Sequence, residues 1–432
     1  MTQLAVPSLI NRVICPQCWH KFAPQDVLWI SEHQDLFNLD TRVPNAQLRF
    51  LPSRFTPNAE ALDSRGFPCH RLACPNCHLE MPRSMLEMES LFLSVLGAPG
   101  SGKSYFLAAM ANQLRKTLPL KFNATFSDAD ATLNTRLRAS EQQLFANSNP
   151  DKLQELQELI HKTQEGGDDF GYVDVNFGSQ SVRYLRPFAF TMQVQRDHPN
   201  PSRRGYSRAI CLYDNAGESF LPGFDRASAP VTRHLAESRA LFFVYDPLQD
   251  SRFRVLDSSL EEGIVDKSHL GSQEGVFQEA ANRIRRFAGL SSREKYSRPV
   301  IVVVTKCDRW AKLADRELIQ RSPIVSTQMK LPAGNTVDLN ALDMRLIDTV
   351  SSRTRDLLLR MTPEVVTAVE NFSKRVCYIP VSAIGESTSV NKETGRPVIR
   401  PSDAQPTWAE IPFLFALSIS SQGLIPKLKA VH

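Results

Sequence analysis

The sequence predicts an α/β fold in which a mostly parallel, six-stranded sheet carries helices on both faces and follows a small cysteine-containing module. Three observations predict it. Apolar runs of about five residues recur between longer helix-forming segments, which is typical of a parallel sheet. A glycine-rich turn joins the first long run to a helix, and five of the eight cysteines lie within the first 77 residues. We therefore expect a module over residues 1–86 and an α/β domain over 87–426, with a long insertion at about 116–186.

Composition gives only weak information about partners. The 432 residues carry 51 basic and 46 acidic side chains, and a net charge of +5 gives no reason to infer nucleic-acid binding. The first residues lack a basic region followed by an apolar stretch, so no secretory signal is expected. The apolar run at 411–417 is too short to span a membrane. These features predict a soluble, cytoplasmic protein.

The N-terminal cysteines form two similar knuckles separated by an inserted segment at 21–68. Each knuckle has the form Cys-Pro-x-Cys, and two such turns together offer four thiolates to one tetrahedral ion. We predict a structural zinc site on Cys15, Cys18, Cys74 and Cys77. Cys69 or His70 could replace one ligand or simply pack nearby, and a redox dithiol is disfavoured because no thioredoxin-like context surrounds the knuckles. Such a module could dock protein or nucleic acid.

A glycine-rich loop follows the first long apolar run, residues 91–96. Its eight residues allow successive backbone N–H groups to surround a polyphosphate, and a helix from Ser104 to about Arg115 points its positive end at that anion. Lys103 can reach the β- and γ-phosphates, and the Ser104 hydroxyl can bind Mg²⁺. The loop predicts nucleoside triphosphate binding by Gly97, Ala98, Pro99, Gly100, Ser101, Gly102, Lys103 and Ser104.

Three further apolar runs end in polar motifs. Residues 209–213 precede Asp214, which can hold Mg²⁺ through water, and Gly217, whose N–H can bind the γ-phosphate. Residues 300–304 precede Thr305, Lys306 and Asp308. The Asp308 carboxylate can accept hydrogen bonds from the two donor nitrogens of guanine, and the Lys306 stem can cover the base. The fourth run, 376–381, ends in Ser382 and Ala383, where a backbone N–H could meet the guanine oxygen.

The remaining elements complete the predicted sheet. Residues 187–195 and 208–213 are expected to form a hairpin, and residues 241–245 fill a central position. Helices are expected at 274–289, 341–360, from about 362 and at 407–420, and a polar helix-forming stretch lies at 151–160. Ligands of such sheets bind at the carboxyl ends of the strands, where all four motifs lie.

Taken in this order, the four motifs resemble those of the P-loop GTPases of the Ras-like and translation-factor (TRAFAC) class, over about residues 88–425. The resemblance implies a P-loop GTPase fold whose nucleotide site contains residues 97–104, Asp214 with Gly217, Thr305-Lys306-Asp308 and Ser382-Ala383. Thr305 stands where asparagine is commoner. The phrases at 213–218, 245–249 and 423–426 also resemble the bacterial double-GTPase proteins, inferred parts of multi-component conflict systems, some with zinc ribbons.

Two departures from the family pattern affect the expected chemistry. Glu218 stands where many Ras-like proteins have the glutamine that orients the attacking water, so turnover is expected to be slow or to use another group. The segment 116–186 is much longer than a usual first switch, and among Thr125, Thr132 and Thr163 no Mg²⁺-binding residue can be selected. No arginine finger can be assigned, since Arg226 and Arg233 resemble ordinary surface charges.

The sequence thus predicts a GTP-binding, Mg²⁺-dependent switch that hydrolyses GTP with Lys103 and Glu218 as catalytic residues. Its expected partners are a protein effector or a second GTPase, in a defence-like bacterial system. Two alternatives remain open. One is an ATP-dependent machine subunit that uses the zinc module to bind nucleic acid, and the other is a scaffold that binds GTP but barely hydrolyses it.

Overall fold

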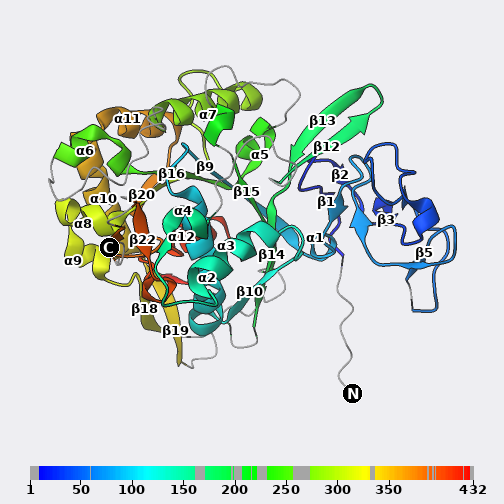
Figure 1. Ribbon diagram of the computed structural model, residues 1–432, viewed down its shortest axis with the longest axis horizontal. Coiled ribbons are helices and arrows are strands. Elements are labelled where there is room, and N and C mark those ends of the chain that lie inside the picture. Colours follow the sequence, from blue (N-terminus) through cyan, green and yellow to red (C-terminus); the bar gives the residue numbers. More distant parts are fainter. Residues whose placement is uncertain are drawn as a thin grey trace.

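The computed structural model describes residues 9–58, 60–160, 171–195, 198, 207–215, 217–220, 231–255, 273–330, 336–386, 389–391, 394, 396–421 and 423–428. Within these residues the chain forms a mixed α/β structure around one large sheet, with a small β-rich module at its N-terminal end (Figure 1). The mixed α/β class predicted from the sequence is confirmed.

The central sheet has seven strands in the order β10-β14-β15-β9-β16-β17-β20. Neighbours from β15 to β20 pair in parallel, whereas β10, β14 and β15 pair antiparallel, so the expected hairpin of β14 with β15 is present. The strands are β9 (Glu89–Gly97), β10 (Ala124–Asp128), β14 (Phe188–Val194), β15 (Arg208–Asp214), β16 (Ala240–Tyr245), β17 (Val300–Val304) and β20 (Val376–Pro380).

The prediction of six strands was one too few. The additional strand, β10, lies at the sheet edge and pairs with β14 inside the stretch taken to be an insertion. Only Ala124 and Phe126 of its five residues are buried, and Ser127 and Asp128 are polar. An edge strand with one covered face carries a weaker apolar signal than strands buried on both faces.

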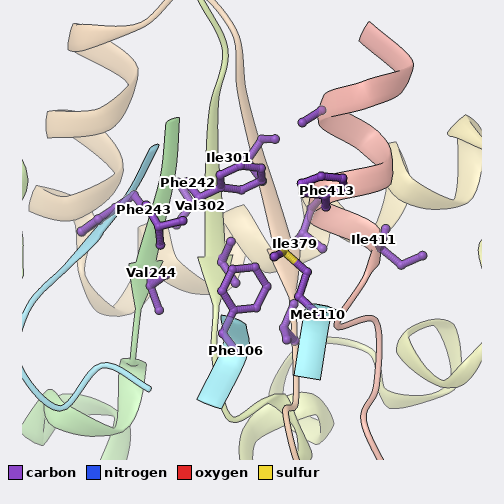
Figure 2. Close-up of a cluster of buried hydrophobic side chains, with 14 of the residues drawn as sticks. Phe106, Met110, Phe242, Phe243, Val244, Ile301, Val302, Ile379, Ile411 and Phe413 are labelled. Atoms are coloured by element: carbon purple, nitrogen blue, oxygen red, sulfur yellow. The ribbon is translucent and has the colours of Figure 1, made fainter. Parts of the chain in front are cut away.

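Helices cover both faces of the sheet, and its central strands β16 and β17 are apolar throughout. Phe243 of β16 contacts Phe277 of α7 (Gln273–Ala288), with ring centroids 4.8 Å apart. Phe106 and Met110 of α2 (Lys103–Phe122) and Phe413 of α12 (Ile411–Ser420) belong to one buried cluster with strand residues such as Ile379, as Figure 2 shows. Alternate side chains of each strand therefore enter two separate halves of one core.

The helices match the expected positions except in one segment. The described helices of the main domain also include α3 (Thr135–Phe145), α5 (Val231–Glu237), α6 (Ser251–Val255), α8 (Cys307–Ala314), α9 (Arg316–Gln320), α10 (Met344–Met361) and α11 (Pro363–Phe372). The stretch 151–160 is not a continuous helix, because it forms β11 (Gln154–Glu155) and the single turn α4 (Leu156–Leu159). β11 pairs with β22 (Pro397–Ile399), which in turn pairs with β21 (Ser389–Val390), so a distant partner overrides the local helix propensity.

The N-terminal module consists of very short strands arranged around the two knuckles. Its four-stranded sheet has the order β4-β3-β7-β8, and two further pairs are β1 with β2 and β5 with β6. The elements are β1 (Val13–Ile14), β2 (Lys21–Phe22), β3 (Leu28–Ile30), β4 (Arg49–Phe50), β5 (Ala61–Leu62), β6 (Pro68–Cys69), β7 (Leu72–Ala73), β8 (Glu80–Met81) and α1 (Ser84–Glu87).

This module packs directly on the main sheet through a second hydrophobic core. Trp19 of the first knuckle contacts Phe92 of β9 at 4.3 Å between ring centroids and stacks on Tyr213 of β15 at 6.0 Å. The hairpin of β12 (Tyr172–Phe177) and β13 (Gln180–Leu185) joins the same core through Val175 and Tyr184. Figure 1 shows this hairpin beside the module. Part of the predicted insertion therefore braces the N-terminal module.

A last small sheet lies near the C-terminal end of the described chain. β18 (Ile324–Lys330) and β19 (Thr336–Asp343) pair antiparallel, and β23 (Lys427–Leu428) adds to β19 in parallel. Among the residues described, no helix combines the length and apolar character needed to cross a membrane.

The interface between module and sheet predicts a specific stability loss. Trp19 is 5% exposed, so Trp19→Ala should lower the free energy of unfolding by about 3 kcal/mol because it leaves a cavity against Phe92 and Tyr213. Leu51→Ala is the matched control in the same module. Because Leu51 is 62% exposed, this substitution should lower the free energy of unfolding by less than about 0.5 kcal/mol. Urea unfolding measures both variants. Equal stability of the two would show that the interface contributes little.

Candidate functional site

The glycine-rich loop lies between β9 and α2, at the carboxyl edge of the sheet. Gly100 and Gly102 have φ of 74° and 86°, values that side chains with a Cβ rarely adopt, so the tight turn requires glycine at both positions. Ser101 donates its backbone N–H to the carbonyl of Ala98 at 3.2 Å. Lys103 and Ser104 are the first two residues of α2, and Lys103 is buried. The loop therefore has the strand–turn–helix context that the sequence predicted.

Gly217 lies directly against this loop. A Cβ built on Gly217 would stand 2.5 Å from the carbonyl oxygen of Gly97 and 2.8 Å from the ring of Pro99. A Cβ on Gly97 would likewise stand 2.6 Å from the carbonyl oxygen of Val244. Such distances exclude any side chain at either position, so glycine is required for the segment after β15 to reach the loop.

Asp214, at the end of β15, faces two cationic side chains. Its Oδ1 lies 3.9 Å from Lys103 Nζ, and its Oδ2 accepts a hydrogen bond of 2.9 Å from Arg136 Nη2. The carboxylate is only 5% exposed, which strengthens both interactions relative to a surface pair. Arg136 belongs to α3 and was not selected from the sequence, because 78 residues separate it from Asp214.

The third motif supports the loop from the other side. Thr305 Oγ1 donates to the carbonyl oxygen of Ser101 at 2.9 Å, which ties the end of β17 to the glycine-rich turn. Lys306 has a left-handed backbone, with φ of 56°, and its Nζ donates to Oδ2 of the buried Asp246 at 2.6 Å. Asp246 is another residue that sequence reasoning missed, although it directly follows the central strand β16.

Asp308 and Ser382 meet where the third and fourth motifs converge. Burial raises the pKa of Asp308, and a hydrogen bond with Ser382 opposes that rise. Ser382 is buried, and its Oγ accepts the backbone N–H of Gly385 at 2.9 Å. Ala383 packs partly against the main core. The structure thus brings residues 97–104, Asp214, Gly217, Thr305, Lys306, Asp308, Ser382 and Ala383 to one edge of the sheet.

Several polar atoms around the loop are buried without a hydrogen bond within the described part of the chain: Ser101 Oγ, Asp214 Oδ1, Gln249 Oε1 and Arg136 Nη1. Gln249 also donates its Nε2 to the carbonyl oxygen of Pro99, so it too lies over the loop. Buried polar groups normally have partners. A guanidinium N–H suits a phosphate oxygen, and a carboxylate oxygen suits a hard cation, so these residues fit an anionic phosphate ligand with a divalent ion.

Some predicted site residues stand elsewhere or are not described. The Glu218 side chain and Thr163 and Arg226 lie outside the described residues. Thr125 is on the edge strand β10, where its Oγ1 bonds the Gln193 carbonyl, and Thr132 is exposed. Neither contacts Asp214 through any hydrogen bond observed in the described structure, whereas Arg136 from the same segment does.

The four knuckle cysteines form a single buried cluster. Sγ atoms of Cys15 and Cys77 are 3.7 Å apart, those of Cys18 and Cys74 are 3.6 Å apart, and all four lie within 4.8 Å of one another. Sulfurs bound tetrahedrally to zinc at about 2.3 Å would be about 3.8 Å apart, whereas a disulfide requires about 2.05 Å. The cluster therefore matches a metal site rather than two disulfides.

The surroundings of the sulfurs repeat in the two knuckles. The backbone N–H groups of Gln17 and Asn76 donate to Cys15 and Cys74 at 3.4 Å, and Asn76 Nδ2 donates to Cys18. The residue after each second cysteine is left-handed, with φ of 62° at Trp19 and 59° at His78. Such N–H···S bonds stabilise thiolates and orient them toward a cation.

Neither alternative ligand considered from the sequence joins the cluster. The Cys69 thiol instead donates to the carbonyl oxygen of Phe67. His70 is exposed and pairs weakly with Glu60 at 3.8 Å. Within the described residues, a four-cysteine site is thus the arrangement that could hold zinc.

A buried chain of side chains links the first knuckle to the segment after β15. Tyr213 donates its hydroxyl to the Pro16 carbonyl and stacks on His234 at 4.6 Å. His234 Nε2 contacts Asn215 Oδ1 at 2.6 Å, and Asn215 donates its backbone N–H and Nδ2 to the Val95 carbonyl. Burial lowers the pKa of His234 to about 3, so its ring is neutral and donates to Asn215.

Arg233, on the same helix as His234, secures this link. Its guanidinium donates to the carbonyl oxygens of Cys18 and Trp19, both at 3.4 Å. Sequence reasoning treated Arg233 as a surface charge, but it holds the first knuckle against α5. We name the set Trp19, Tyr213, Arg233, His234 and Asn215 the knuckle–strand network.

No family model matches the chain. A region of 198 residues is 26% identical to the putative ESX-1 scaffolding and assembly protein SaeC of Mycolicibacterium smegmatis. The match covers 46% of this chain and 43% of that protein, so the chain spans less than half the length of its relative.

The cysteine cluster predicts metal content that depends on specific thiols. Cys74→Ser should reduce bound zinc from one equivalent to a small fraction, because three thiolates and a hydroxyl bind zinc more weakly than four thiolates. Cys69→Ser, a buried cysteine of the same module outside the cluster, should retain the metal. Elemental analysis of the purified variants measures both. Equal zinc loss in the two would contradict the four-cysteine assignment.

Proposed function

We propose that the chain is a GTP-binding, Mg²⁺-dependent switch that hydrolyses GTP. The observation that carries this proposal is the convergence of four motifs at the carboxyl edge of strands β15, β9, β17 and β20. After β9 the chain forms β10, β14 and β15 on one side of it and then crosses to form β16, β17 and β20 on the other side, and such a switch point is where α/β sheets bind ligands. The contacts of Gly217 and Thr305 with the glycine-rich loop support a shared site for one ligand.

Each residue has a role that follows from its chemistry. Backbone N–H groups of the loop would surround the β- and γ-phosphates, with Lys103 supplying a fixed positive charge. Ser104 and Asp214 would hold Mg²⁺, which neutralises phosphate charge when bound. Asp308 would accept from the guanine donors, and Ser382 and Ala383 would flank the base. Gly217 would bind the γ-phosphate through its N–H, so hydrolysis would release the segment it belongs to.

The knuckle–strand network suggests how such a release would be transmitted. Asn215 lies between Asp214 and Gly217, and its partners lead through His234 and Tyr213 to the first knuckle. A movement of the segment after β15 would therefore be transmitted through these contacts to the N-terminal module. We assign zinc a structural role there, since four thiolates leave no open position for catalysis.

We also propose that the chain binds protein partners. The relative is named a scaffolding and assembly protein, which supports protein partners over nucleic acid for this chain. A protein effector or a second GTPase of a bacterial conflict system fits that view, as does a scaffold that hydrolyses GTP slowly. An ATP-dependent machine is disfavoured, because Asp308 offers only acceptors to the base.

Removal of the loop lysine tests the proposed activity. Wild-type protein should release phosphate from GTP with Mg²⁺, and Lys103→Ala should lower GTP affinity at least about 100-fold, because a buried charge-assisted contact is lost. Lys116→Ala, an exposed lysine on the same helix, should behave as wild type. Calorimetry and phosphate release measure the two effects. Unchanged affinity in Lys103→Ala would refute the proposed site.

A change of base preference tests the role of Asp308. Asp308→Asn replaces an acceptor by an amide that can donate, so GDP affinity should fall at least about 10-fold while affinity for xanthosine diphosphate rises. Asp315→Asn is the control, because Asp315 caps α9 through the Leu318 N–H and is not part of the site. Competition with a fluorescent nucleotide measures both. A loss of affinity for all diphosphates alike would indicate disruption rather than base readout.

A further inference from the structure

Arg136 is the one arginine that the described structure places on the Asp214 carboxylate. We propose that Arg136 is a catalytic residue that binds the γ-phosphate and stabilises the charge that develops there during hydrolysis. The inference rests on the proposed function and adds to it. It supplies from within the chain the cationic group that could not be assigned from the sequence.

The backbone around Arg136 is held rigidly beside the sheet. Asn134, fully buried just before α3, donates Nδ2 to Asp128 Oδ1 at 2.6 Å and to the Ala189 carbonyl at 2.8 Å. Its Oδ1 accepts the Ala189 N–H at 2.8 Å, so one side chain joins α3 to both β10 and β14. Arg115 of α2 further fixes α3 through Glu141, at 2.9 Å. Catalytic groups act best from such rigid elements.

The guanidinium of Arg136 is held in one orientation, but not all of its N–H donors have a hydrogen-bond partner in the described structure. One face lies on the Phe188 ring, with Cζ 5.1 Å from the centroid, and Nη2 donates to Asp214 Oδ2 at 2.9 Å. Nη1 is buried and has no hydrogen-bond partner in the described structure. Four arginines of the described structure have such an unpaired buried nitrogen, and Arg136 is the one whose guanidinium also lies on the Asp214 carboxylate beside the glycine-rich loop. The unused N–H groups of Nη1 point to a missing anionic partner.

Charge balance at the loop supports the same conclusion. Lys103 and Arg136 are two cations that face the single carboxylate of Asp214. Their combined excess of positive charge suits the arrival of an anion. On nucleotide binding, Arg136 would exchange an oxygen of Asp214 for an oxygen of the γ-phosphate, keeping a charge-assisted partner throughout. The Asp214 carboxylate would then be available to bind Mg²⁺.

The chemical step is simple hydrolysis. The oxygen of a water molecule forms a bond to the γ-phosphorus, and the bond from that phosphorus to the β,γ-bridging oxygen breaks with its electron pair passing to GDP. One hydrogen of the water stays on the attacking oxygen and the other passes to a γ-oxygen, so both leave with inorganic phosphate. Negative charge moves onto the bridging and γ-oxygens in the transition state, where a guanidinium donor lowers its energy. Arg136 thereby supplies charge stabilisation, a role separate from the water orientation that glutamine provides at the position of Glu218 in many Ras-like proteins.

The test compares Arg136→Ala with wild type and with Arg138→Ala. Arg138 lies on the same helix but pairs with Asp128 and Glu141, away from Asp214. Two readouts are measured: single-turnover hydrolysis of GTP, and the affinity of GDP with and without aluminium fluoride, which mimics the transferred phosphoryl group. Thermal unfolding of each variant reports folding. Arg136→Lys retains the charge but not the planar fork.

Arg136→Ala should hydrolyse GTP at least about 100-fold more slowly, bind GDP within about 3-fold of wild type, and lose the gain in affinity that aluminium fluoride gives. Arg136→Lys should hydrolyse GTP at a rate between those of wild type and Arg136→Ala, and Arg138→Ala should match wild type in both readouts. Hydrolysis and aluminium fluoride binding at wild-type levels in a folded Arg136→Ala would overturn this inference while leaving GTP binding intact. Wild-type protein that binds no GDP would instead overturn the proposed function, and this inference with it.

Discussion

The contact between Gly217 and the backbone of Gly97 sets the geometry on which the candidate site depends. Because no side chain fits between them, the segment after β15 lies against the glycine-rich loop, and Asp214 is carried to within reach of Lys103. Thr305 holds the same loop from β17. Three strand ends are thereby fixed around one turn, and any ligand bound by that turn must also meet Asp214 and Gly217.

The second core extends this constraint to the N-terminal module. Trp19 follows a cluster cysteine directly, and its ring packs on Phe92 and Tyr213 of the two strands that carry the loop and Asp214. Arg233 and His234 connect the same knuckle to Asn215. The module therefore packs on the same strand ends that carry the candidate site.

The sequence analysis predicted the parts of the site that local pattern determines. Spacing in the sequence identifies the loop residues, the strand ends at Asp214, Thr305 and Ser382, and the four clustered cysteines. The structure places all of them where that spacing predicts. Their roles in nucleotide binding remain predictions. The edge strand β10 was missed because three of its five residues are polar.

Residues that act through distant contacts could not be predicted. Arg136 reaches Asp214 across 78 positions and Lys306 reaches Asp246 across 60, and neither local sequence indicates which distant residue will be the partner. Similarly, Trp19 within a knuckle resembles any core aromatic residue until its contact with Tyr213 is known. The segment at 151–160 shows the reverse error, since pairing with β22 overrides its helical composition.

The central claim is that this edge of the sheet binds a guanine nucleotide, and side-by-side calorimetric titration of the wild-type protein with GDP and ADP in the presence of Mg²⁺ tests it most directly. The account predicts that GDP binds at least about 100-fold more tightly, because Asp308 accepts two hydrogen bonds that adenine cannot offer. Equal affinity for the two, or a preference for ADP, would contradict the account.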